Sequence, residues 1–150
     1  MSKDKKIKKI KVIGYKVFIH PHYPLPSLRC ELENGKFFDM SAIPFDAAIA
    51  IERLANGVDI TSDPRMVLAL ILAEIPSVEG ALRGAVEEVV IDDILRHTGG
   101  YVYCANVKIK INGKTIRRVM VPSSAIVLAL LSGADVYVNE KFVSTFVEEV

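Results

Sequence analysis

The sequence lacks the features that mark membrane, disulfide-rich and metal-binding proteins. Its longest uninterrupted apolar run, Met66 to Ala73, falls far short of the ~20 residues that cross a bilayer, so we expect no membrane span. The chain has only 2 cysteines, Cys30 and Cys104, and neither has a second thiol or a histidine at metal-ligand spacing. We interpret both as buried free thiols, with a bridge between them as the alternative.

An excess of charge of one sign is also lacking. The formal net charge is +1, so any surface for nucleic acid would have to be local. Several lysines lie close together near the N-terminus, between Lys3 and Lys11. We interpret this segment as a solvated, fraying terminus, with a phosphate-binding arm as the alternative. There is no glycine loop that would cradle a phosphate and no nucleophile placed with a histidine. Without an export signal, we expect a cytoplasmic protein.

Length and composition favour one folded domain. A chain of 150 residues can bury roughly 70% of the surface of its unfolded form. Hydrophobic residues make up 51% and charged residues 25%, proportions that are typical of a packed protein and not of a disordered one. We therefore expect a single domain with a sizeable hydrophobic core.

The most informative feature that is present is internal repetition. Asn34-Gly35-Lys36 recurs as Asn112-Gly113-Lys114, and Ile43-Pro44 recurs as Val121-Pro122, both at an offset of 78 residues. An apolar helical run follows each proline. The repetition predicts an α+β domain made of two related β-hairpin-plus-helix halves, at about residues 7–76 and 85–150, with a mostly antiparallel sheet and packed helices.

The Asn-Gly pairs predict two-residue type I′ turns. With Asn112-Gly113 as a turn, Lys108 lies opposite Arg117, and Lys110 joins them on one locally basic face. Like charges in register favour solvent screening or an anionic neighbour, either a carboxylate of the same protein or a phosphate. Lys108, Lys110 and Arg117 are therefore the candidate nucleic-acid-binding residues, although no aromatic side chains accompany them.

Proline and glycine predict the ends of the helices. Pro44 and Pro122 suit helix starts, and Gly57 and Gly133 suit helix ends. Another helix is expected from Ser62 or Asp63 to Glu74, where Pro76 stops it. Because this helix has almost no polar side, it should lie inside the domain or against another subunit, which predicts a homodimer or a higher oligomer.

The remaining segments are predicted to be strands, a loop, a segment that suits either a loop or a short helix, and a last helix. Strands are expected over residues 7–20, 86–95 and 101–111, with a loop at residues 20–26 because of its prolines. Residues 77–84 suit a loop or a short helix, and a last helix is expected from Glu140. His20 and His22 form a weak pair of metal ligands, and His97 is interpreted as a turn residue.

Five ordered blocks carry a family resemblance. They are Pro44-Phe45-Asp46-Ala47, Thr61-Ser62-Asp63, Val89 to Asp93, Pro122 to Leu130, and Gly133 to Val138. In this order the chain, from roughly Val12 to Val143, resembles the bifunctional nuclease (BFN) domain family. Members of that family show a Pro-Phe-Glu-Ala block, a Thr-His-Asp block and an Asp-Ala-Arg-Pro-Ser-Asp-Ala block.

The resemblance implies a metal-dependent nuclease that acts on DNA or RNA. Asp46 and Asp63 are its candidate catalytic acids, and Asp46, Asp63, Asp92 and Asp93 its candidate ligands for Mg²⁺ or Mn²⁺, since hard cations prefer oxygen donors. The same acids have structural explanations. Asp46 and Asp63 stand at predicted helix starts, and Asp92 and Asp93 are neighbours on a strand, where alternation sends them to opposite faces.

Departures from the family pattern weaken the catalytic interpretation. Ser62 replaces the histidine of the second block, and Val119, Val121 and Ser124 replace the Asp, Arg and Asp of the third. A phosphodiesterase needs such groups to hold metal, prepare water or stabilise charge. We therefore expect a non-catalytic interaction or oligomerisation module, and the alternative is a metal-dependent nuclease.

Overall fold

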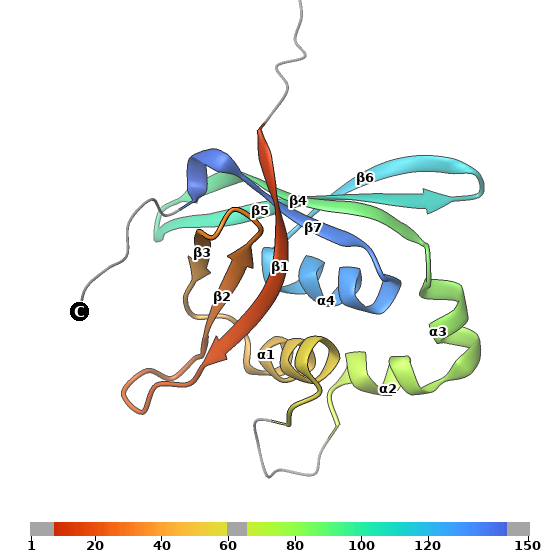
Figure 1. Cartoon of the computed structure of the whole chain (residues 1–150), viewed down its shortest axis with the longest axis horizontal. Helices are drawn as coiled ribbons and strands as arrows, with labels where there is room; N and C mark the ends of the chain where they lie inside the picture. Colours follow the sequence, from red (N-terminus) through yellow and green to blue (C-terminus); the bar gives the residue numbers. More distant parts are fainter. Residues whose placement is uncertain (1–7, 60–65, 144–150) are drawn as a thin grey trace, which may run out of the picture.

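The residues described by the structure, a computed structural model, are 8–59 and 66–143. They form a seven-stranded sheet with helices packed against one face (Figure 1). The first part contains β1 (Lys9–Phe18), β2 (Ser27–Leu32), β3 (Phe37–Met40), α1 (Phe45–Ile51) and its π-helical continuation η1 (Glu52–Asn56). Next come α2 (Leu68–Glu74), α3 (Pro76–Leu82), β4 (Val86–His97), β5 (Gly100–Ile111), β6 (Lys114–Met120), α4 (Pro122–Ser132), β7 (Asp135–Asn139) and the 3₁₀ turn η2 (Glu140–Phe142).

The order of the strands confirms the predicted α+β fold with two similar halves. The order is β3-β2-β1-β7-β4-β5-β6, so each half is a three-stranded meander followed by a helix, β1-β2-β3-α1 and β4-β5-β6-α4. β7 lies between the halves and pairs antiparallel with β1 and parallel with β4. The other neighbouring strands pair antiparallel.

The shared core lies between the sheet and the helices α1 and α4. Apolar residues on the strands alternate inward, as expected where only one face of a sheet is covered. Fully buried residues from both halves and from β7 meet there; they are Ile51, Val89, Ile91, Ala105, Val107, Ile126, Ala129 and Val138. The Phe38 ring of β3 also meets the Tyr103 ring of β5, with 4.9 Å between their centroids. The sheet therefore curls until its first and second halves touch.

The two predicted hairpins exist, but only one has the predicted turn. Asn112 (φ 50°) and Gly113 (φ 78°) form the two-residue turn between β5 and β6, and Lys108 pairs with Arg117 as expected. The two-residue turn predicted at Asn34-Gly35 is wrong. The Leu32 amide donates to the Lys36 carbonyl, so three residues form the loop, and the Glu33 amide within it is held by the Lys11 carbonyl of β1.

The helix boundaries follow the predicted prolines and glycines where the structure describes them. Pro44 precedes α1, Pro122 opens α4, and Gly57 and Gly133 adopt left-handed backbone at the helix ends. α2 begins at Leu68, and the candidate start at Ser62 or Asp63 lies outside the described residues. Pro76 ends α2 and opens α3, so residues 77–84 begin as a short helix.

The C-terminal helix predicted from Glu140 is not formed over its first residues. Glu140 to Phe142 make a 3₁₀ turn, and Val143 after them is extended. Residues 144–150, over which this helix would continue, lie outside the described residues. The Asn139 side chain accepts a hydrogen bond from the Lys141 amide, which stabilises the turn directly after β7.

The glycine that ends α4 provides a test of this local structure. Gly133 has φ 76°, in the left-handed region that L-residues rarely adopt. We expect Gly133→Ala to lower the free energy of unfolding by roughly 1 kcal/mol. Gly80→Ala, inside α3 and with no heavy atom within 4 Å of the added Cβ, should instead be neutral or stabilising by about 0.5–1 kcal/mol. Urea unfolding measures the free energy of unfolding of both variants. Equal changes in the two would contradict the left-handed conformation of Gly133.

Candidate functional site

The candidate metal ligands are spread over the fold. Asp46 is exposed at the start of α1, where its Oδ1 accepts a hydrogen bond from the Ala47 amide at 2.9 Å. Asp63 lies outside the described residues. Asp92 and Asp93 are on β4, in the second half of the fold. Within residues 8–59 and 66–143, no three His, Cys, Asp or Glu side chains gather in a way that would hold a metal ion.

Asp92 and Asp93 do not obey the predicted alternation. The register of β4 with β5 shifts between Ile91 and Asp93, so Asp92 is an extra residue in a bulge. Asp93 lies opposite Cys104, and the Asp92 carboxylate accepts a hydrogen bond from the Asn106 side chain at 2.7 Å. Cys104 and Asn106 share one face of β5, so both acids lie on that same face. The prediction that they point to opposite faces is wrong, because the bulge cancels one step of the alternation.

Two of the candidate nucleic-acid contacts are engaged in ion pairs with the protein itself. Lys108 lies opposite Arg117, and its Nζ is 3.3 Å from the Glu88 carboxylate. Lys110 lies 3.9 Å from Glu87, which also accepts a hydrogen bond from the Thr115 hydroxyl. The anionic neighbours of this basic face are therefore carboxylates of the same protein, Glu88 and Glu87. Arg117 is exposed, and among the described residues its guanidinium has no ion pair.

Glu88 is the centre of this charged group. Its carboxylate also lies 2.9 Å from Lys9 Nζ, so a strand of the first half is tied to two strands of the second. Burial by itself would raise the pKa of Glu88, but hydrogen bonds and charge from Lys9 and Lys108 outweigh it and hold the pKa below its usual range. Because folding lowers this pKa, the contribution to stability is present above the unfolded value of about 4.3 and is lost as pH falls through the folded value.

The pH dependence of stability tests the Glu88 group. We expect Glu88→Gln to lower the free energy of unfolding at pH 7, because Lys9 and Lys108 then lack their shared anion. The difference from the original protein should shrink as pH falls below the usual carboxylate pKa, which urea titrations between pH 7 and pH 3 measure. Glu33→Gln, at an exposed turn position, is the control for general charge effects. A Glu88→Gln penalty that stays constant with pH would contradict the account.

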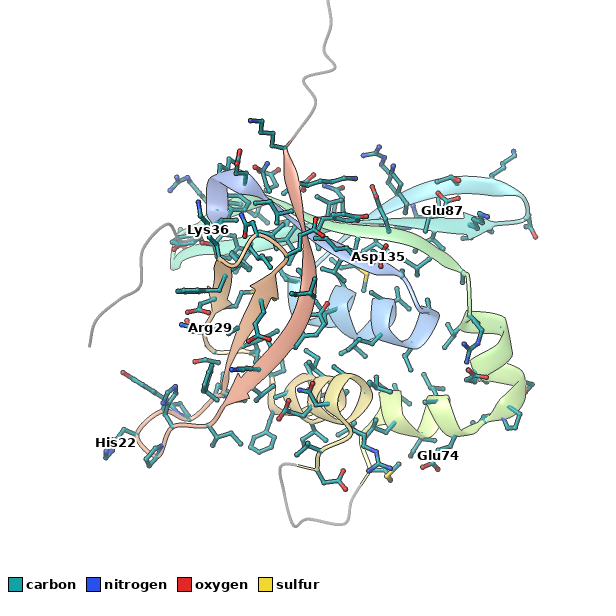
Figure 2. All side chains as sticks on the ribbon, viewed as in Figure 1. His22, Arg29, Lys36, Glu74, Glu87 and Asp135 are labelled. Carbon is teal, nitrogen blue, oxygen red and sulfur yellow. The ribbon has the colours of Figure 1, made fainter. Side chains whose placement is uncertain are left out.

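The histidines and cysteines that the structure describes form no metal-binding group. His22 projects from the tip of the loop between β1 and β2 (Figure 2). The His20 ring lies against Tyr23, with 5.4 Å between centroids, and the side chain of His97 is outside what the structure describes. Both cysteines are free, as predicted, but only Cys30 is fully buried, and burial raises the pKa of its thiol to about 12. The Cys30 thiol is therefore poorly suited to act as a nucleophile.

α2 carries an exposed apolar surface. Leu68 and Ile71, one turn apart on α2, are 72% and 43% exposed, and Ile75, the extended residue directly after the helix, is 40% exposed, whereas Leu70 on the other side is buried. We call the three exposed residues the α2 face. The helix lies at one corner of the molecule, next to α3 and away from the sheet (Figure 1). Of the two predicted environments for this helix, the interior of the domain is therefore wrong. None of the helices in the described part of the chain is long and apolar enough to span a bilayer.

A cavity of about 390 Å³ lies where the two halves meet, and we call it the α4 cavity. It is lined by residues 39–44 between β3 and α1, by residues 101–103 of β5 and by residues 121–123 at the start of α4. The equivalent segments Ile43-Pro44 and Val121-Pro122 of the two halves thus line one space. Ala42 in its wall has φ 56°, a strained backbone for a residue other than glycine.

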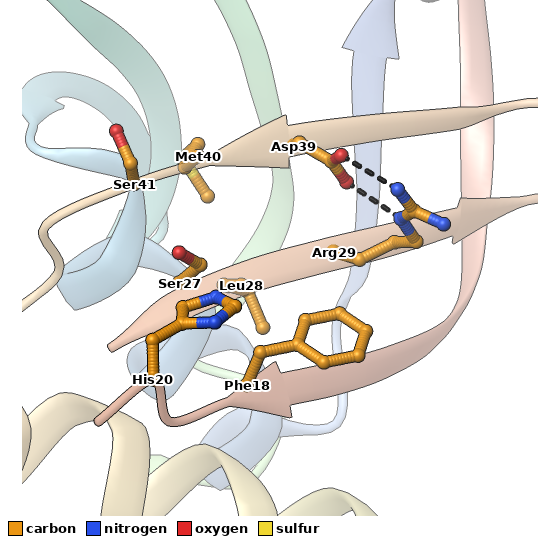
Figure 3. A pocket seen from close by; sticks show the side chains of 8 residues that line it. All are labelled: Phe18, His20, Ser27, Leu28, Arg29, Asp39, Met40 and Ser41. Atoms are coloured by element: carbon orange, nitrogen blue, oxygen red, sulfur yellow. Dashed lines mark hydrogen bonds and ion pairs between the residues drawn. The ribbon is translucent and has the colours of Figure 1, made fainter. Parts of the chain in front are cut away.

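A second cavity, of about 550 Å³, adjoins the α4 cavity across residues 39–41. Figure 3 shows its walls, in which the Arg29 guanidinium faces the Asp39 carboxylate on the neighbouring strand. Two hydrogen bonds of 2.8 Å join these groups, and Arg29 also stacks on the Phe37 ring at 3.8 Å. Arg29 and Asp39 therefore satisfy each other, and the charge of Asp39, which lines both cavities, is neutralised.

The residues that line the α4 cavity were not among the predicted site residues. Ser123, Tyr101 and Tyr103 carry no recognisable catalytic pattern in the sequence, and only folding brings them together. The one available signal was the Val121-Pro122 start of α4, which has no side chain placed to cap it. No family model matches the chain, and no curated protein matches it either.

Proposed function

We propose that the protein is an interaction module that associates with a second copy of itself through the α2 face. The observation that carries this proposal is the exposure of Leu68 and Ile71 on one side of a helix that has almost no polar residues, together with the exposure of Ile75 directly after the helix. A helix at a protein surface normally turns a polar side to water. A contiguous apolar side that faces water instead is typical of an interaction surface.

Burial of the α2 face would supply the free energy that drives self-association. Transfer of an exposed aliphatic side chain out of water contributes on the order of 1–2 kcal/mol. A twofold interface uses the same surface on both subunits, so the contribution of each residue counts twice. Leu68, at 72% exposure, has the most apolar surface to lose and therefore makes the largest contribution.

The surroundings of the α2 face suit a second copy. On the other side of the helix, a groove is lined by the apolar residues Met66 and Leu70 and by the charged residues Arg53, Asp59 and Glu74, and Arg53 and Asp59 pair with each other at 3.3 Å. The net charge of +1 adds little repulsion between copies.

The family resemblance supplies the alternative, a metal-dependent nuclease. Of its two carried-over acids, the described one, Asp46, hydrogen-bonds the first turn of its own helix. Of the basic residues proposed to contact a nucleic acid, Lys108 and Lys110 are paired with Glu88 and Glu87. These groups are already used within the fold, so we place self-association first.

A charge introduced on the α2 face tests the proposal. Scattering-derived mass of the original protein should exceed the 16.5 kDa of one chain, and Leu68→Asp should reduce it to that value, because a carboxylate cannot be buried without a partner. Leu95→Asp is the matched control, since Leu95 is 59% exposed on β4, and it should leave the mass unchanged.

Two results would count against self-association through α2. One is a mass of a single chain for the original protein at every concentration measured. The other is an oligomer whose mass is the same in Leu68→Asp as in the original protein, which would move the interface to another surface.

A further inference from the structure

The start of α4 presents unused hydrogen-bond donors to the α4 cavity. Val121 and Pro122 provide no side-chain cap, and the first main-chain bond of the helix runs from the Ala125 amide to the Val121 carbonyl at 3.1 Å. The amides of Ser123 and Ser124 therefore have no acceptor among the described residues. Uncapped amides at the start of a helix carry a partial positive charge and favour an anion.

A buried hydroxyl points to the same place. Ser123 is only 4% exposed and lines the α4 cavity, yet within the described chain its hydroxyl makes no hydrogen bond. The Ser123 hydroxyl is not among the polar atoms that are fully withdrawn from water, so it is a free donor that a molecule in the cavity can reach. A ligand atom that accepts a hydrogen bond from Ser123 would use this donor.

Comparison of the two halves shows a difference between the two helix starts. At the offset of 78 residues, Ser124 in α4 corresponds to Asp46 in α1. The Asp46 carboxylate accepts a hydrogen bond from an amide in the first turn of its helix. The equivalent turn of α4 has a serine in place of that carboxylate, so the first half carries within its own chain an anion that the second half lacks.

The other residues that line the cavity indicate which kind of molecule would fit beside the start of α4. Ile43, Pro44 and Val121 are apolar, and the rings of Tyr101 and Tyr103 meet edge to face with 5.8 Å between centroids. Asp39 is the one ionisable carboxylate among the lining residues, and Arg29 neutralises it. No lysine or arginine lines the cavity in the described chain, so a single negative charge suits it better than the two of a phosphate.

We propose that the α4 cavity binds a small monocarboxylate with an aromatic or aliphatic body. The carboxylate accepts hydrogen bonds from the Ser123 hydroxyl and from the first amides of α4. The apolar body lies among Pro44, Val121 and the two tyrosines. The volume of about 390 Å³ is within the range of small-molecule sites. This site is separate from the α2 face and does not depend on self-association.

Benzoate is a suitable probe, with benzamide as its neutral analogue and inorganic phosphate as an anion without an apolar body. Titrations of the isotope-labelled full chain, followed by NMR, should show saturable benzoate shifts at the Ser123 and Ser124 amides. Because a hydrogen bond to a charged group is lost, Ser123→Ala should weaken benzoate binding about tenfold. Benzamide should also bind about tenfold more weakly than benzoate.

Ser132→Ala is the matched control, because Ser132 is equally buried in the same helix and its hydroxyl also lacks a partner among the described residues. It should bind benzoate like the original protein. Val121→Phe, which fills the cavity from a half-exposed position, should abolish binding without removing a donor. Benzoate that binds without saturation, that binds equally to Ser123→Ala, or that binds no better than benzamide or phosphate would overturn the proposal.

Discussion

The burial of α1 and α4 against one face of a continuous sheet is the interaction on which the rest of the structure depends. Neither half could complete this core alone, because Ile51 of α1 and Ile126 of α4 are both fully buried in one cluster that also contains Val89 and Val107. β7 makes the sheet continuous, since it pairs with β1 on one side and β4 on the other. Its residue Val138 lies at the centre of the shared interior.

Features set by local chemistry could be predicted from the sequence. The turn at Asn112-Gly113 and the pairing of Lys108 with Arg117 follow from two residues that tolerate positive φ. Features set by distant contacts could not. The place of β7 depends on a pairing across the chain, and the longer turn at Glu33 depends on the Lys11 carbonyl of a neighbouring strand. The bulge at Asp92 likewise has no clear signal in the residues around it.

The candidate sites show the same division. Repetition of short blocks drew attention to Asp46 and to the start of α4, but the sequence alone could not show that the two helix starts line one cavity. The two helix starts also differ, because Asp46 supplies an acceptor to the first turn of α1, whereas no side chain caps α4. Apolar composition identified α2 as unusual, and only the fold decided that its apolar side faces water.

The claim that both halves share one interior is tested most directly by hydrogen exchange in a Val138→Ala variant. Removal of two methyl groups from a fully buried site should cost about 2 kcal/mol, or roughly a 30-fold faster exchange of globally protected amides. The account predicts the same acceleration for Leu28 and Cys30 of β2 as for Ala105 and Val107 of β5. Faster exchange in one of these strands with unchanged exchange in the other would contradict it.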